Sequence, residues 1–140
     1  MSDDKTLIQQ LRSVPLFEGL SDRSLKAIAS KARVVDQPAG KEVVSEGGGG
    51  AGFHLILEGS ATVSLHGTER RTLHPGDYFG EISMIDGKPR SASVQVGEGL
   101  RTLSLPAWEF RPLLEEQPEI ARTLLLTLCE RLRQAEERTV

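Results

Sequence analysis

The sequence predicts a mainly β protein, an antiparallel jelly-roll β-barrel (a double-stranded β-helix) with helices at both ends. Between residues 33 and 105, short apolar segments with period-two alternation follow one another, and glycine or proline turns separate them. Helical periodicity of apolar residues occurs before and after this region. Many short strands at regular spacing favour a sandwich or a barrel. The 140 residues suffice for one domain.

The N-terminal segment, residues 1–32, is expected to hold two helices. In the first, apolar residues recur at helical spacing until Pro15 ends the run. Ser21 is a suitable N-cap for the second, and Asp22 follows in its first turn. The apolar face of this second helix comprises Leu25, Ile28, Ala29 and Ala32.

The barrel is expected over residues 33–105. Its predicted strands cover 33–35, 42–45, 53–58, 61–65, 70–73, 93–96 and 100–105. Its predicted turns contain Gly or Pro and lie at 38–40, 47–52, 58–59, 66–67, 75–76 and 97–99. The glycine run at 47–50 lacks a following Gly-Lys-Ser/Thr, so it is read as a mobile hairpin turn and not as a triphosphate loop.

The C-terminal segment, residues 106–140, is expected to hold a short helix over 107–115 and a longer one over 119–138. The apolar face of the longer helix comprises Ala121, Leu124, Leu125, Leu128, Leu132 and Ala135. We expect Cys129 to be a buried thiol in this helix. Trp108 and Phe110 are expected to pack in the core, with a contact to a partner as the alternative.

The segment 78–94, Y-F-G-E-I-S-M-I-D-G-K-P-R-S-A-S-V, has the residues that a sugar phosphate needs. Gly80 allows close approach of the backbone to a ligand. Glu81 can accept hydrogen bonds from ribose hydroxyls, and Arg90 offers a planar fork of donors for phosphate oxygens. If a short helix starts here, the amides of Ile82, Ser83 and Met84 would point its positive end at an anion. These features predict a site for a ligand with hydroxyls at one end and a negative charge at the other.

This segment also resembles the phosphate-binding cassette of the cyclic nucleotide-binding domain family, which includes proteins like the cAMP receptor protein and protein kinase A regulatory subunits. The match runs without a gap from F-G-E at 79–81 to P-R-S-A-S-V at 89–94. It extends to E-G and F-H-L-I-L-E-G-S-A within 46–61 and to H-P-G-D-Y-F at 74–79. The resemblance covers essentially the whole chain, from about residue 15 to 134.

The resemblance implies that this protein binds a cyclic nucleotide and that the last helix acts as a lid. The ligand-binding residues would be Phe79, Gly80, Glu81, Ile82, Ser83, Arg90, Ser91 and Ala92. The serine at position 91 favours cAMP over cGMP as the ligand. Some bacterial relatives place a hydroxyl residue of the last helix against the base. Here Ala135 falls at that position, with Glu136 next to it, and Arg131, Arg133 or Glu136 could make the base contact in its place.

Composition limits the other classes of function. The net charge of −3, from 17 basic and 20 acidic residues, gives no general attraction to nucleic acid or to an anionic membrane. The N-terminus begins acidic and has no apolar region of the kind that a signal peptide needs, so we expect no secretory signal. No run is long enough to span a membrane, and the single cysteine fits a reducing compartment, so we expect a cytoplasmic protein. We expect no effector domain after Val140, which favours a bacterial-type regulator that acts on a protein partner in trans, with a homodimer through the last helix as an option.

Two alternatives remain open. The first is a repurposed, ligand-free interaction module on the same fold, which the loss of a polar base contact at residue 135 would favour. The second is a metal-dependent enzyme with a cupin-like barrel. Its histidines would be His54, His66 and His74, but these lie too far apart in the sequence for such a site, and no nucleophile has a base at a useful spacing. We therefore expect no metal, no cofactor and no enzymatic activity.

Overall fold

A computed structural model describes residues 4–44, 52–88 and 92–139 of the chain. The chain divides into two compact units. One, the sheet unit, is Lys31–Arg111, and the other, the helical unit, combines Met1–Ser30 with Pro112–Val140. Helix α4, Ala107–Glu116, contains the junction between them.

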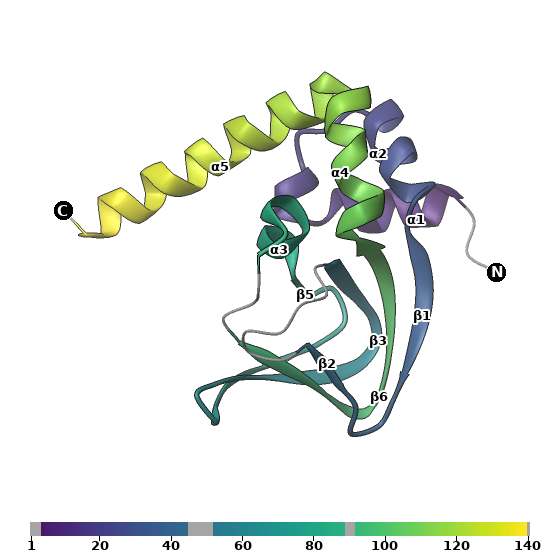
Figure 1. Cartoon of the computed structure of the whole chain (residues 1–140), viewed down its shortest axis with the longest axis vertical. Coiled ribbons are helices and arrows are strands. Elements are labelled where there is room, and N and C mark those ends of the chain that lie inside the picture. The colour runs from purple at the N-terminus through teal and green to yellow at the C-terminus, as the bar shows by residue number, and fades with distance from the viewer. Residues whose placement is uncertain (1–3, 45–51, 89–91, 140) are drawn as a thin grey trace. The chain divides into compact units, whose positions relative to one another are not determined.

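The helical unit contains α1 (Asp4–Arg12), the 3-10 helix η1 (Pro15–Phe17), α2 (Asp22–Ala29) and α5 (Pro118–Thr139), drawn in Figure 1. The Ser21 side chain accepts a hydrogen bond from the Ser24 amide at 3.2 Å, which confirms Ser21 as an N-cap. Glu119, at the start of α5, accepts hydrogen bonds from the hydroxyls of Ser21 (2.8 Å) and Ser24 (3.1 Å). These bonds join the first turns of α2 and α5.

The predicted helices of this unit are confirmed, but only the N-terminal third of α5 is well buried. Ile120 and Leu124 lie in the core, whereas Leu125, Leu126 and Leu132 are more than 60% exposed. Cys129 is exposed too, so the expectation of a buried thiol was wrong. The apolar residues of α5 occupy more of the helix circumference than the rest of the unit covers. The spacing of these residues in the sequence therefore did not show which of them are buried.

The sheet unit is built on a six-stranded antiparallel sheet with the strand order β1–β6–β3–β4. Its strands are β1 (Arg33–Pro38), β2 (Glu42–Val44), β3 (Gly52–Leu65), β4 (Thr68–Leu73), β5 (Tyr78–Phe79) and β6 (Ser93–Pro106). β2 pairs with β6, and β5 pairs with β3. Figure 1 shows that β3 and β6 curve strongly. The predicted fold class is confirmed, although the hydrogen-bonded order of the described strands does not close into a ring.

Two predicted turns are instead bends within long strands. The expected turn at 58–59 lies inside β3, and the one at 97–99 lies inside β6. Gly59 has φ +92° and pairs with Leu100, and the register of β3 against β6 shifts on both sides of Gly59. A Cβ atom on Gly59 would lie 2.0 Å from the carbonyl oxygen of Gly99. The glycines permit a close backbone approach in a bulged, bent ladder and do not end the strands.

The core under the candidate site is a cluster on one face of this sheet, which we call the inner face. It comprises Ile56, Ala61, Leu73, Phe79, Val94, Val96 and Leu100, with Val43 and Val63 packed against it. After β6 the chain enters α4, where Phe110 is fully buried but Trp108 is 72% exposed. The expectation of core packing is thus correct for Phe110 and wrong for Trp108, whose place in the first turn of α4 leaves the indole in solvent.

Candidate functional site

The site begins where β5 meets α3 (Glu81–Asp86). Phe79 pairs with His54 of β3, and their rings stack with centroids 4.9 Å apart. Gly80 follows with φ +89°, a left-handed conformation that a side chain would strain, and it caps the N-terminus of α3. The sequence thus anchors Phe79 in the core and turns sharply, so that Glu81 is the first residue of a helix.

The short helix is present, and its amides divide into two sets. The Met84 amide donates a hydrogen bond to the Gly80 carbonyl at 3.0 Å and so closes the first turn of the helix. The prediction that this amide is available to bind an anion was therefore wrong. The amides of Ile82 and Ser83 lie in the first turn, where N–H groups have no partner within the helix. The Ile82 side chain is 61% exposed, whereas Ser83 and Met84 are buried. Glu81 is half-buried.

The far end of α3 is fixed by a second left-handed glycine. Gly87, with φ +72°, donates its amide to the Ser83 carbonyl at 2.8 Å, and the Lys88 amide donates to the Asp86 carboxylate at 2.8 Å. A Cβ atom on Gly87 would lie 3.1 Å from a guanidinium nitrogen of Arg111, so the start of α4 adjoins the end of α3. Arg90 and Ser91 lie outside the described residues. The description resumes at Ala92, immediately before β6.

The structure brings both ends of this segment to the same core. Phe79, before Gly80 and Glu81, and Val94, after Ala92, belong to one cluster on the inner face. β3 carries both ends, because it pairs with β5 at His54 and with β6 at Val63 and Ser64. Gly80, Glu81 and Ala92 are therefore presented from one curved sheet.

A polar group beneath Phe79 was not predicted from the sequence. The Nδ1 atom of His54 lies 2.8 Å from the Ser104 hydroxyl, which lies 2.8 Å from the buried hydroxyl of Thr102. The His54 ring supports Phe79 by stacking, so this chain of hydrogen bonds fixes the ring that precedes the Gly80 turn. Only the register of β3 against β6, which pairs His54 with Ser104, could have indicated it.

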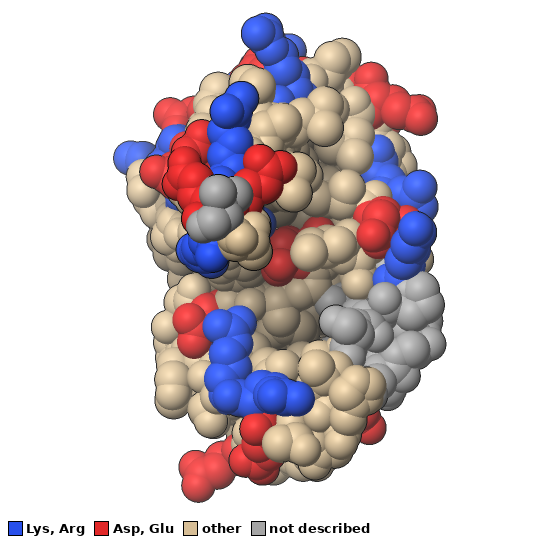
Figure 2. All heavy atoms as spheres, turned by 90° about the vertical axis from the view of Figure 1, so that its left-hand side faces the viewer, with Lys and Arg blue, Asp and Glu red and all other residues tan. Residues whose placement is uncertain are grey.

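The residues predicted to meet a base belong to the helical unit. Arg133, Ala135 and Glu136 are exposed on α5. Acidic and basic side chains are interspersed on the face drawn in Figure 2. Among residues 4–44, 52–88 and 92–139, no three His, Cys, Asp or Glu side chains gather as metal ligands would. No helix in those ranges is both long and apolar enough to cross a membrane.

Comparisons with known proteins agree with this geometry. The family model of the cyclic nucleotide-binding domain matches residues 34–117. A cyclic nucleotide-gated potassium channel of Rhizobium etli is 38% identical over 88% of this chain, and a CRP-like cAMP-activated global transcriptional regulator of Mycobacterium tuberculosis is 29% identical over 84%. The chain spans only 34% of the channel and 55% of the regulator.

A solved structure shares the fold over nearly its full length. The N-terminal domain of a transcriptional regulator from Streptomyces coelicolor aligns with a TM-score of 0.84 and 25% identity, covering 94% of this chain and 95% of that one. The family match includes the whole segment from Phe79 to Val94 and most of the sheet unit. The chain therefore belongs to the cyclic nucleotide-binding domain family.

Proposed function

We propose that this protein binds a cyclic nucleoside monophosphate, with cAMP preferred over cGMP, through residues 79–83 and 90–92. The observation that carries the proposal is the turn at Gly80. This turn places the half-buried Glu81 at the start of α3, and Val94, two residues after Ala92, belongs to the same core cluster as Phe79. A ligand held between these ends would meet an acid and free amides on a preformed scaffold, which lowers the entropic cost of binding.

Each part of the ligand would have a partner. Glu81 would accept from the ribose 2′-hydroxyl, and Arg90 would pair with the cyclic phosphate through a charge-assisted fork, with the amides of Ser91 and Ala92 beside it. Gly80 would let the backbone approach the sugar, because it has no Cβ. Phe79, Ile82 and Ser83 would form the wall around these groups.

The preference for cAMP is supported by Ser91 and by the names of relatives, which include a cAMP-activated regulator and a cAMP-dependent protein kinase regulatory subunit of Emericella nidulans. We further propose a non-enzymatic sensor in the cytoplasm that signals to a protein partner in trans through movement of α5. Arg133, Ala135 or Glu136 would contact the base, and a homodimer through α5 would cover its exposed leucines.

The test uses Arg90→Ala and the matched control Lys88→Ala, which removes the same charge two residues earlier. Protein freed of nucleotide is titrated calorimetrically with cAMP and with cGMP. A charge-assisted contact to phosphate contributes about 1.5–3 kcal/mol, so Arg90→Ala is expected to lose about tenfold to several hundredfold in affinity. Lys88→Ala should change little, and both variants should keep the thermal unfolding midpoint of the wild type.

The result also decides between the proposal and its alternative. A wild-type protein that binds neither nucleotide would be a ligand-free interaction module, which Ala135 favours because its side chain cannot hydrogen-bond a base. Equal affinity of wild type and Arg90→Ala would remove Arg90 from the site and refute the assignment of the phosphate contact.

A further inference from the structure

His54 of β3 lies beside the start of the candidate site, on the inner face of the sheet. It pairs with Phe79 of β5 on one side and with Ser104 of β6 on the other. Residues that pair directly share a face of the sheet, and Phe79 belongs to the core cluster of the inner face. The imidazole of His54 is therefore held between a hydroxyl group and the phenyl ring that precedes the Gly80 turn.

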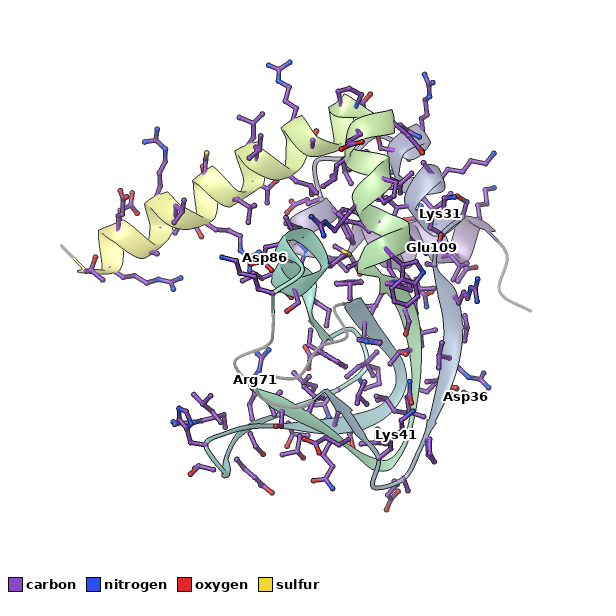
Figure 3. All side chains as sticks on the ribbon, in the orientation of Figure 1. Lys31, Asp36, Lys41, Arg71, Asp86 and Glu109 are labelled. Carbon is purple, nitrogen blue, oxygen red and sulfur yellow. The ribbon has the colours of Figure 1, made fainter. Side chains whose placement is uncertain are left out.

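The polar contacts of His54 are separate from the ion pair on the other face of the sheet. Its Nδ1 atom lies 2.8 Å from the hydroxyl of Ser104, which lies 2.8 Å from the hydroxyl of the fully buried Thr102. Arg101 adjoins Thr102 in β6 and so points to the opposite face, where it contacts Asp36 at 2.8 Å. Figure 3 shows Asp36 directed away from the space that the curved strands enclose. The imidazole is thus fixed by buried hydroxyls, whose hydrogen bonds are costly to break.

The stack between His54 and Phe79 bears on the position of Glu81. The two ring centroids are 4.9 Å apart, and the ring planes are 23° from parallel. Glu81 follows Phe79 by two residues, so their Cα atoms lie within about 8 Å of each other. Gly80 between them has no side chain that could anchor its left-handed turn. The place of the Glu81 carboxylate therefore depends on Phe79 before the turn and on α3 after it.

We propose that His54 is a positioning residue for the nucleotide site. It acts through Phe79 and holds the Glu81 carboxylate where that group meets the ribose 2′-hydroxyl. The inference rests on the proposed function, which gives Glu81 this contact. Histidine fits the role because one ring supplies two anchors: its face stacks on Phe79, and its Nδ1 atom bonds the Ser104 hydroxyl. A phenyl ring at position 54 would supply the first anchor only.

This role predicts an effect on one part of the ligand. A carboxylate that shifts loses its hydrogen bond to the 2′-hydroxyl, because hydrogen bonds weaken steeply with distance and angle. The phosphate contact, assigned to Arg90, does not pass through Phe79. Removal of the His54 ring is therefore expected to lower the affinity for cAMP and to leave the affinity for 2′-deoxy-cAMP nearly unchanged. A general loss of structure would instead lower both affinities alike.

The test titrates full-length wild type, His54→Ala, His54→Phe and Ser104→Ala with cAMP and with 2′-deoxy-cAMP by calorimetry. The measured quantity is the ratio of the two affinities. An aromatic stack is worth about two- to tenfold in an equilibrium constant, so His54→Ala should lower the ratio by about that factor. His54→Phe, which keeps the stack, should recover part of this loss. Ser104→Ala should resemble His54→Phe, and the double variant should lose no more, because both changes remove the same hydrogen bond.

Two controls separate positioning from other effects. His74→Ala removes an exposed imidazole from the turn before β5. Ser21→Ala removes the N-cap of α2 and so destabilises the helical unit, and thermal unfolding compares this loss with that of His54→Ala. Neither control should change the ratio of affinities.

The outcomes separate this inference from the proposed function. Wild type that binds neither ligand overturns both, and wild type that binds the two ligands equally overturns the Glu81 contact and this inference with it. Wild type that discriminates, with the same ratio in every His54 and Ser104 variant, overturns the role of His54 alone. Equal losses for the two ligands in His54→Ala would mean a general structural effect and would overturn it too. A ratio that falls in His54→Ala, recovers in part in His54→Phe and is unchanged in both controls supports the inference. If His54→Ala does not fold, a lowered ratio in both His54→Phe and Ser104→Ala supports it, and an unchanged ratio overturns it.

Discussion

Gly59→Ala is expected to be among the most destabilising single changes in the sheet unit. Its φ of +92° imposes a left-handed conformation on alanine, which costs about 1–2 kcal/mol. The new Cβ would also lie 2.0 Å from the Gly99 carbonyl oxygen, a backbone atom that no rotamer change can move. Overpacking of this kind costs about 1–3 kcal/mol, so the expected loss is about 2–5 kcal/mol in total.

Gly76→Ala provides the matched control. Gly76 has φ +94°, and a Cβ atom there would meet nothing within 4 Å. The control should lose only the conformational term, about 1–2 kcal/mol. Urea unfolding of the two variants beside wild type measures both losses. In thermal unfolding, each kcal/mol should lower the midpoint by about 3–5 °C for a chain of this size.

Equal losses in Gly59→Ala and Gly76→Ala would refute the close approach of Gly59 to Gly99 and, with it, our account of the bend. The bend also matters for binding. Gly59 lies between the part of β3 that pairs with β5, at His54, and the part that carries Val63. A folded Gly59→Ala variant is therefore expected to bind cyclic nucleotide more weakly than Gly76→Ala.

Other predictions concern the ligand, the last helix and pH. A 2′-deoxy cyclic nucleotide should bind wild type more weakly, and Glu81→Ala should abolish that difference; an equal loss in both proteins would give Glu81 another role. Bound nucleotide should slow amide exchange over 128–136 and 80–90, and deletion beyond Arg131 should weaken binding by about 1–2 kcal/mol; unchanged affinity would exclude α5 as a lid. Hydrogen bonds from Ser21 and Ser24 lower the pKa of Glu119, so its stabilising effect is present above its unfolded pKa and lost as pH falls through the folded pKa. Stability should thus decline below about pH 4.3, less steeply in Glu119→Gln, and identical pH profiles would contradict this.

The fold was predictable where local sequence determines local structure. The helices follow from apolar periodicity and from caps such as Ser21, and the strands follow from alternation. Gly59 and the glycines at 97 and 99 were misread, because a glycine in an alternating pattern signals a turn and a bulge equally well. Only the pairing of β3 with β6 distinguishes a turn from a bulge here. This pairing joins residues that are far apart in the sequence, so the local pattern could not indicate it.

In the candidate site too, features set by local sequence were predictable and features set by strand pairing were not. The Gly80 turn and the short helix after it were predictable, because the conformational freedom of a glycine and the preference of an acid for the first helical turn depend only on neighbouring residues. The support of Phe79 by His54 was not predictable, because it depends on the register between β3 and β5. Trp108 was misjudged because a bulky aromatic residue is more often buried than exposed.

The proposed coupling between a bound ligand and α5 would have two routes along the chain. The sheet unit and the helical unit join at residues 30–31 and again at 111–112. The second junction lies inside α4, where Pro112 has no amide to donate to the carbonyl of residue 108, so the helix bends there at lower cost. Arg111, the last residue of the sheet unit, lies against Gly87, which ends α3. A ligand that shifts α3 would thus act on the junction through which α4 leads to α5.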